Sequence, residues 1–301
     1  MRKALKMVAV ALAVLGLLAA AAFFTAHSMG SRKLGRTVDV RVVPVAYATD
    51  AAALKLGKYL FESRGCGECH GMNGAGRVMF EDSGGLFVRS PNITPGPGSA
   101  VAAYKEADWV RAIRHGVSPR GRALLIMPSE DYNRLTDTDF ASLVAYVRSL
   151  ASATGAAGEV RLPPFMKALY GAGAMRDAAE KIDHRLPPSA PVAVAASVEH
   201  GNYVANMCIG CHGEGLSGGR IPGAPHDWPS ASNLTPGEGG VMGRYDSLDK
   251  FVAMMRTGKR PDGAAVSKVM PFESLARFND VDLQALHAYL GTVRARKAGE
   301  R

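Results

Sequence analysis

The strongest constraint on this chain is a five-residue pattern, Cys-x-x-Cys-His, that occurs twice. It runs from Cys66 to His70 and again from Cys208 to His212. This pattern is typical of c-type haem attachment, because two thiols at this spacing add to the two vinyl groups of one haem. The adjacent imidazole then binds the iron from one side. The expected covalent attachments are Cys66, Cys69, Cys208 and Cys211, and the expected axial histidines are His70 and His212.

Two other kinds of site use the same cysteine spacing. A redox dithiol uses Cys-x-x-Cys but does not need the trailing histidine, and zinc could be held by the four thiolates of two such pairs. The chain has four cysteines in all, so none is left over when each pair takes one haem. The sequence therefore predicts two covalently bound haem c groups.

The two halves of the chain are repeats of one another. The run Asn-Ile-Thr-Pro-Gly at 92–96 returns as Asn-Leu-Thr-Pro-Gly at 233–237, and Met127-Pro128 returns as Met270-Pro271. A period of about 140 residues indicates a duplicated domain rather than a solenoid. We expect one domain over residues 45–151, a linker over 152–194 and a second domain over 195–297. The proline-rich linker has no counterpart within the first domain, and it serves either as a plain strap or as a docking element.

Helical signals occupy the same places in both domains. Gly57 and Gly201, ahead of the haem motifs, would let another helix approach closely, and Gly116 and Gly258 would end a middle helix. Thr136 with Asp139, and Asn279 with Asp282, are typical of capping boxes at the start of a final helix. Convincing strand alternation is missing from the sequence, so the predicted fold class is all-α, with each domain wrapped round one covalent haem.

The second axial position of each iron decides what the haem can do. Met127 and Met270 match between the repeats, and each precedes a proline in the loop before the final helix. Methionine ligation raises the haem potential and closes the iron to substrates. We expect these two methionines as the sixth ligands, while the other reading is that they fill gaps in the core, as most methionines do.

The N-terminus carries a long apolar stretch after three basic residues. Residues 7–26 are uncharged and rich in Ala, Val and Leu, and twenty such residues cross a hydrocarbon core of about 30 Å. A clear A-x-A cleavage site is not found after this stretch, so we expect residues 1–30 to be an N-terminal transmembrane anchor, with a cleaved signal as the alternative. The basic start favours an exported body. The expected location is the periplasmic side of the cell inner membrane, or the periplasm itself after cleavage.

The formal net charge of +9 favours an acidic partner or an anionic membrane surface. Nucleic acid is not expected as a partner, because the chain has no dense Lys/Arg run with interleaved aromatic residues.

Both halves resemble class I cytochrome c domains, over about residues 50–150 and 196–296. That family has a helix leading into the Cys-x-x-Cys-His motif and a Met-Pro loop before its last helix. More narrowly, the Asn-Ile/Leu-Thr-Pro-Gly runs and the Met-Pro pairs are similar to membrane-bound cytochrome c subunits of periplasmic alcohol, aldehyde and gluconate dehydrogenases. Those subunits typically carry three haems, whereas this chain has motifs for two.

These observations predict an electron-transfer protein with no catalytic residues, rather than an enzyme. We expect a di-haem carrier in a periplasmic or membrane respiratory chain, with a dehydrogenase, a soluble cytochrome or copper protein, or a terminal oxidase as redox partners. The alternative is the electron-accepting cytochrome c subunit of a periplasmic dehydrogenase complex. A di-haem peroxidase is less favoured, because it needs an open iron position that two Met-Pro loops would close.

Overall fold

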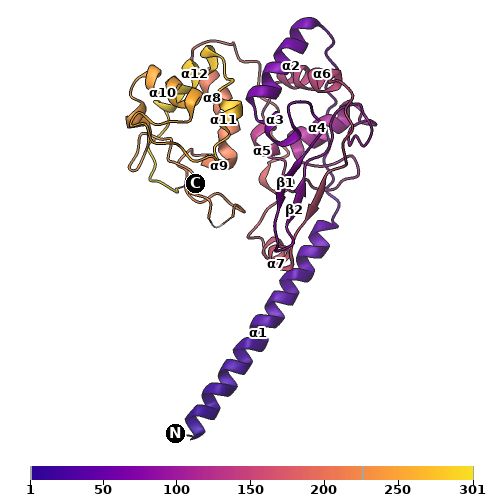
Figure 1. Ribbon diagram of the computed structural model, residues 1–301, viewed down its shortest axis with the longest axis vertical. Helices are drawn as coiled ribbons and strands as arrows, with labels where there is room; N and C mark the ends of the chain where they lie inside the picture. Colours follow the sequence, from indigo (N-terminus) through magenta and orange to yellow (C-terminus); the bar gives the residue numbers. More distant parts are fainter. Residues whose placement is uncertain (1, 226, 301) are drawn as a thin grey trace.

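Two helical bodies stand side by side, and one long helix projects from the first (Figure 1). This computed structural model describes residues 2–225 and 227–300. The first residue of the expected anchor and residue 226 of the expected second domain lie outside this range. The arrangement agrees with the predicted helical architecture of two repeats behind an N-terminal apolar helix.

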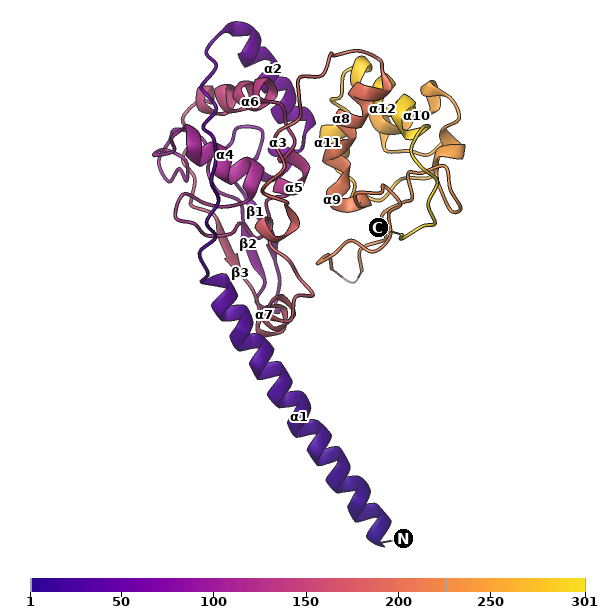
Figure 2. The ribbon, with the colours of Figure 1, turned by 180° about the vertical axis from the view of Figure 1, so that it is seen from behind.

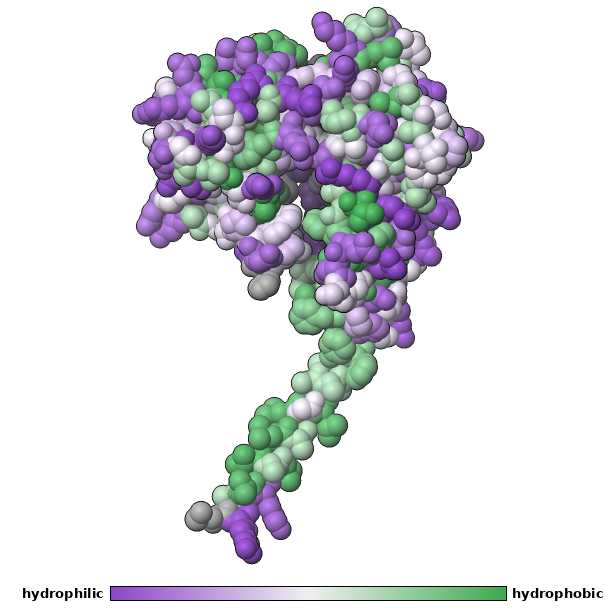
Figure 3. All heavy atoms as spheres, viewed as in Figure 1, coloured by the Kyte–Doolittle hydropathy of each residue, from purple (hydrophilic) through white to green (hydrophobic). Residues whose placement is uncertain are grey.

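The long helix, α1 (Arg2–Leu34), has 33 residues. At a rise of about 1.5 Å per residue it extends about 50 Å. Its most apolar 18-residue window has a mean hydropathy of 2.6 and buries none of its residues in the protein, and within the described residues no other helix qualifies as a candidate membrane span. Figure 3 shows this exposed apolar surface, with hydrophilic side chains at its free end. An exposed apolar helix of this length fits the expected anchor.

The repeats share one set of helices. In the first body the helices are α2 (Ala51–Ser63), α3 (Cys66–His70), α4 (Glu106–His115), α5 (Ser129–Tyr132) and α6 (Asp137–Ser149). In the second body the helical segments are α8 (Val198–Ala205), η2 (Asn206–Cys208), α9 (Ile209–His212), η3 (Met242–Tyr245), α10 (Leu248–Thr257), α11 (Phe272–Leu275) and α12 (Asp280–Leu290).

The first and last helices of each body cross at a glycine. A Cβ atom built on Gly57 of α2 would lie 1.9 Å from the carbonyl oxygen of Ser142 in α6. At the matching place in the second body, a Cβ on Gly201 of α8 would lie 2.0 Å from the carbonyl oxygen of Ala285 in α12. The predicted close helix approach is therefore confirmed, because any side chain at these positions would force the helices apart.

The predicted helix ends are also confirmed. Gly116 and Gly258 end α4 and α10 in the left-handed conformation, with φ of 65° and 66°. At the start of α6, the Thr136 side chain accepts a hydrogen bond from the backbone N–H of Asp139. Asn279 caps α12 in the same way.

A small antiparallel sheet departs from the expected all-helical structure. Its strands are β1 (Val78–Glu81), β2 (Phe87–Arg89) and β3 (Glu159–Arg161), in the order β1-β2-β3. Strands of three or four residues are too short for alternation to be recognised in a sequence. The sheet is minor, but its third strand comes from the linker and joins it to the first body.

After β3 the linker continues along the first body as a strap. Helix α7 (Pro164–Gly171) crosses α1, and the 3₁₀ turn η1 (Ala179–Lys181) follows. Next to this turn, the backbone N–H of Ala178 donates to the Leu124 carbonyl oxygen at 2.9 Å. Figure 2 shows the strap passing from the foot of the first body up to the second. These contacts support the strap interpretation of residues 152–194.

Candidate haem-attachment sites

Each Cys-x-x-Cys-His run folds as a short helical turn that ends at a glycine. Helix α3 follows Gly65 and ends at Gly71, whose φ values of 82° and 74° favour glycine, and α9 ends at Gly213 with a φ of 80°. Residues three apart on a helical turn share one face. The turn therefore presents both cysteines of a pair on one side, as attachment to the two edges of one haem requires.

The histidine of each motif is oriented by a backbone carbonyl. Nδ1 of His70 lies 3.0 Å from the Pro91 carbonyl oxygen, and Nδ1 of His212 lies 2.8 Å from the Ser232 carbonyl oxygen. A carbonyl only accepts, so Nδ1 carries the proton, which leaves the lone pair of Nε2 available to a metal. Burial lowers the pKa of His70, which favours the neutral imidazole that binds a metal. Sequence reasoning missed both carbonyls, although each directly precedes a repeated asparagine.

The environment of the first thiol in each pair differs from that of a redox dithiol. Burial raises the pKa of both Cys66 and Cys208 to about 12. A reactive redox dithiol needs a lowered thiol pKa, so this environment argues against the dithiol reading. Within the described residues, no three His, Cys, Asp or Glu side chains come together to hold a metal ion. The geometry therefore does not assemble the four-thiolate zinc site either.

The two candidate sixth ligands occupy equivalent places. Met127 and Cys66 both pack against the apolar core of the first body, and Met270 and Cys208 both pack against the core of the second body. The proline after each methionine is the N-cap residue of a four-residue helix, α5 or α11. Each body thus supplies a thiol pair, an oriented imidazole and a thioether, which is the donor set that haem c needs. The assignment of both methionines to iron stays a prediction.

The repeated asparagines shape turns. Asn92 is fully buried, and its Nδ2 donates to the carbonyl oxygens of Pro97 and Ala153. Asn233 makes the same pair of bonds to Glu238 and Arg296. Both donor positions of each amide are therefore used within the protein, which favours the turn-shaping role over a bond to a haem propionate.

The repeated arginines Arg114 and Arg256 also have protein partners. Arg114 donates to the Leu135 carbonyl oxygen and pairs with Asp137 at 2.8 Å, while Arg256 donates to the Ala276 carbonyl oxygen and pairs with Asp280 at 3.0 Å. Each arginine ties the end of the Met-Pro segment to the start of the final helix. Each guanidinium is therefore engaged within its own domain.

The two haem motifs lie at the contact between the bodies. Glu68, inside the first motif, accepts a bond of 2.9 Å from the backbone N–H of Ser274 in α11. Reciprocally, Asp131 in α5 accepts a bond of 2.8 Å from the backbone N–H of Gly210, inside the second motif. Each motif therefore touches the helix that follows the candidate methionine of the other body.

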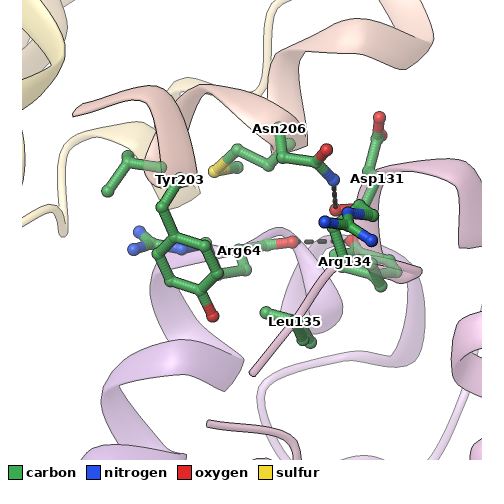
Figure 4. Close-up of a pocket in the computed structure, with 9 residues that line it drawn as sticks. Arg64, Asp131, Arg134, Leu135, Tyr203 and Asn206 are labelled. Atoms are coloured by element: carbon green, nitrogen blue, oxygen red, sulfur yellow. Dashed lines mark hydrogen bonds between the residues drawn. The ribbon is translucent and has the colours of Figure 1, made fainter. Parts of the chain in front are cut away.

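A small cavity lies beside this contact (Figure 4). Asn206 of the second body points toward Asp131 and donates to its backbone carbonyl oxygen at 2.9 Å. Within the first body, Tyr132 donates to the Arg64 carbonyl oxygen at 2.7 Å. The Asn206 side chain thus adds a further polar contact between the two bodies.

Comparison with known families agrees with these sites. The family model described as Cytochrome c matches residues 54–151, and the model described as Cytochrome C oxidase, cbb3-type, subunit III matches residues 196–290. Each matched range contains one Cys-x-x-Cys-His motif and one Met-Pro pair.

Curated relatives include cytochrome subunits of dehydrogenases. The fructose dehydrogenase cytochrome subunit of Gluconobacter japonicus is 32% identical over 118 residues, covering 36% of this chain and 24% of that protein. The alcohol dehydrogenase (quinone) cytochrome c subunit of Gluconobacter oxydans (strain 621H) is 35% identical over 100 residues, covering 31% and 21%.

A third relative aligns with most of the chain. The gluconate 2-dehydrogenase cytochrome c subunit of Pantoea cypripedii is 27% identical over 281 residues, covering 83% of this chain and 61% of the relative. All three relatives extend well beyond the region that they share with this chain. The residue pattern, the geometry and the family matches agree that the chain consists of two cytochrome c domains, of the kind that binds haem c covalently, behind an N-terminal apolar helix.

Proposed function

We propose that this chain binds two haem c groups and passes electrons between them, tethered by α1 to the periplasmic side of the inner membrane. Cys66 and Cys69 would hold the first haem, and Cys208 and Cys211 the second. The axial pairs would be His70 with Met127 and His212 with Met270. In this proposal the protein carries electrons and has no catalytic residue of its own.

The observation that carries this proposal is the reciprocal contact of the motifs. Glu68 bonds to the α11 backbone and Asp131 bonds to the α9 backbone, so both attachment turns lie against the other domain. Haem supplies the one-electron chemistry when bound. The residues of this chain fix the imidazoles, exclude water around the apolar cores and hold the two attachment turns at a fixed separation.

An electron paramagnetic resonance spectrum of the fully oxidised, haem-loaded protein tests the coordination. Two low-spin signals are expected, because a histidine and a methionine would fill both axial positions of each iron. A substantial high-spin signal would contradict closed coordination and would revive the peroxidase alternative. The pyridine haemochrome assay measures the haem content per chain and tests whether two haems are bound.

A second candidate function is the cytochrome subunit of a dehydrogenase complex. The names of the three relatives favour it, and the basic surface charge suits docking to an acidic subunit. Mild-detergent purification from membranes separates the two functions. Recovery with a stoichiometric dehydrogenase favours the subunit role, whereas recovery alone favours a free carrier serving a soluble cytochrome, a copper protein or a terminal oxidase.

A further inference from the structure

The strap lies against α1 where the apolar stretch of that helix ends. A Cβ atom on Gly30 would lie 1.9 Å from the Lys167 carbonyl oxygen, and one on Gly171 would lie 1.9 Å from the Ala26 carbonyl oxygen. Helices approach this closely only where small residues face one another. Ala26 is also the last residue of the uncharged stretch, so α7 crosses α1 at the boundary between its apolar part and its polar end.

Buried polar contacts fix the strap to α1 just beyond this crossing. Tyr170 of α7 is almost fully buried and donates to Asp177, which pairs with Arg36 at 2.6 Å. Lys33, in the last turn of α1, pairs with Glu180 at 2.8 Å. Since these side chains tie α1, α7 and η1 together, the first domain cannot swivel freely about the anchor.

The surface that α7 leaves exposed is apolar. Phe165 has 64% of its surface exposed, and residues 172–174, Ala-Gly-Ala, are exposed as well. The stretch from Leu162 to Met175 contains no acidic residue and only one basic residue, Lys167. Exposed arginines flank it at 161 and 176. Figure 3 shows the apolar surface of α1 continuing onto the foot of the first domain, where α7 lies.

We propose that α7 and the turn after it, residues 164–175, are a second membrane contact that lies in the interface between the headgroups and acyl chains of the outer leaflet. The inference rests on the proposed anchoring by α1, because that anchoring sets the level of the bilayer surface. A helix with an apolar face and flanking basic side chains lies at this level, with its apolar residues a few ångströms into the acyl boundary. Phe24, which is 68% exposed near the end of the apolar stretch, belongs to the same level of the bilayer, where aromatic residues gather.

The consequence is a fixed orientation of the first domain. One helix through the bilayer allows rotation and tilt, whereas a second contact beside it holds the foot of the domain against the surface. The contacts between each haem motif and the other domain would then hold the second domain at a defined height above the membrane surface. A redox partner in the same membrane would meet one face of the protein rather than all of them.

Nitroxide depth measurements on the full, haem-loaded chain in lipid nanodiscs test the proposal. Haem attachment consumes the four native thiols, so single cysteines at Phe165→Cys and Ala174→Cys take the label. Leu15→Cys in α1 is the reference for hydrocarbon, and Lys55→Cys on α2, at the far end of the first domain, is the reference for water. The measured quantity is the ratio of collision with oxygen to collision with a water-soluble nickel chelate.

The expected result is a ratio at positions 165 and 174 that is several-fold above that at 55 and below that at 15. An aqueous ratio at 165 and 174, with a hydrocarbon ratio at 15, would overturn the surface contact while leaving the anchor intact. An aqueous ratio at 15 would instead refute the anchor on which the inference rests. Protection from both reagents at 165 would also overturn it, because the surface would then be covered by protein instead of lipid.

Discussion

The hydroxyl of Tyr59 donates a hydrogen bond of 2.6 Å to the carboxylate of Asp282, which belongs to the other domain. The equivalent contact in the repeat goes from the second domain to the first, since Tyr203 donates to Asp139 at 2.5 Å. In each case the tyrosine oxygen also accepts a bond from the backbone of the residue that caps the helix. The two domains therefore dock through two equivalent tyrosine–aspartate contacts, which are related by approximate two-fold symmetry.

This contact explains why the predicted capping boxes are only half formed. The cap side chains accept from the backbone N–H groups of Asp139 and Asp282, as expected. The two aspartate carboxylates face the other domain and accept from its tyrosines. The capping-box pattern predicted where each helix starts, but it did not predict which group the aspartate side chain would bond to.

We expect replacement of either candidate methionine by alanine to open its iron. Met127→Ala or Met270→Ala should let carbon monoxide bind the reduced haem and should convert one low-spin signal of the oxidised protein to high spin. Met255→Ala is the control, because Met255 is buried in the core and would lose packing without losing a ligand. Normal low-spin spectra in both ligand variants would refute the assignment.

Removal of the Tyr59 hydroxyl should weaken the docking of the domains. Tyr59→Phe leaves the buried Asp282 without one donor, at a cost of about 1–3 kcal/mol. Urea unfolding of the haem-loaded protein measures this loss. Tyr146→Phe is the matched control, since its ring packs on Phe61 and that contact survives the change. A loss no larger than that of the control would argue against a docking role for the hydroxyl.

The domain contact should weaken in acid. Burial pulls the pKa of Asp282 upward, but the charge of Arg64, with hydrogen bonds from Arg64, Tyr59 and His200, outweighs burial and holds the pKa below its ordinary value. The folded protein therefore favours the ionised form, so the stabilisation is complete above the unfolded pKa near 4 and is lost as the pH falls through the lower folded pKa.

Unfolding midpoints measured from pH 7 down to pH 2 test this dependence. Asp282→Asn should be less stable at pH 7 and should show a shallower decline below about pH 4. Asp249→Asn, an exposed carboxylate in the first turn of α10, is the control. An acid decline of equal steepness in the Asp282→Asn variant and the native protein would contradict the assigned role.

Adding a methyl group where the first and last helices of a domain cross should lower the stability of the protein. In Gly57→Ala the added Cβ would meet the Ser142 carbonyl oxygen at 1.9 Å, so α2 and α6 must separate, with an expected loss of about 1–3 kcal/mol or more. Gly243→Ala is the control, because nothing lies within 4 Å of its added Cβ. Equal thermal midpoints for the two variants would show that the crossing is not tight in solution.

The sequence by itself determined the features that depend on neighbours along the chain. The spacing of Cys66, Cys69 and His70 predicts a haem attachment turn, because the three groups lie within one helical turn. Helix ends at Gly116 and Gly258, and the caps before α6 and α12, are local as well. The repeat carried the same information twice, which is why the choice of Met127 and Met270 among 13 methionines could be made at all.

Only the tertiary structure decided which surfaces meet. The Pro91 and Ser232 carbonyls that orient the two imidazoles lie about 20 residues from their histidines, and Tyr59 lies 223 positions from Asp282. The third strand and α7 come from a linker whose sequence has no repeat partner to reveal its place. Such contacts depend on how the helices pack once they have formed. Packing brings together side chains that lie far apart in the sequence, so no local sequence pattern predicts them.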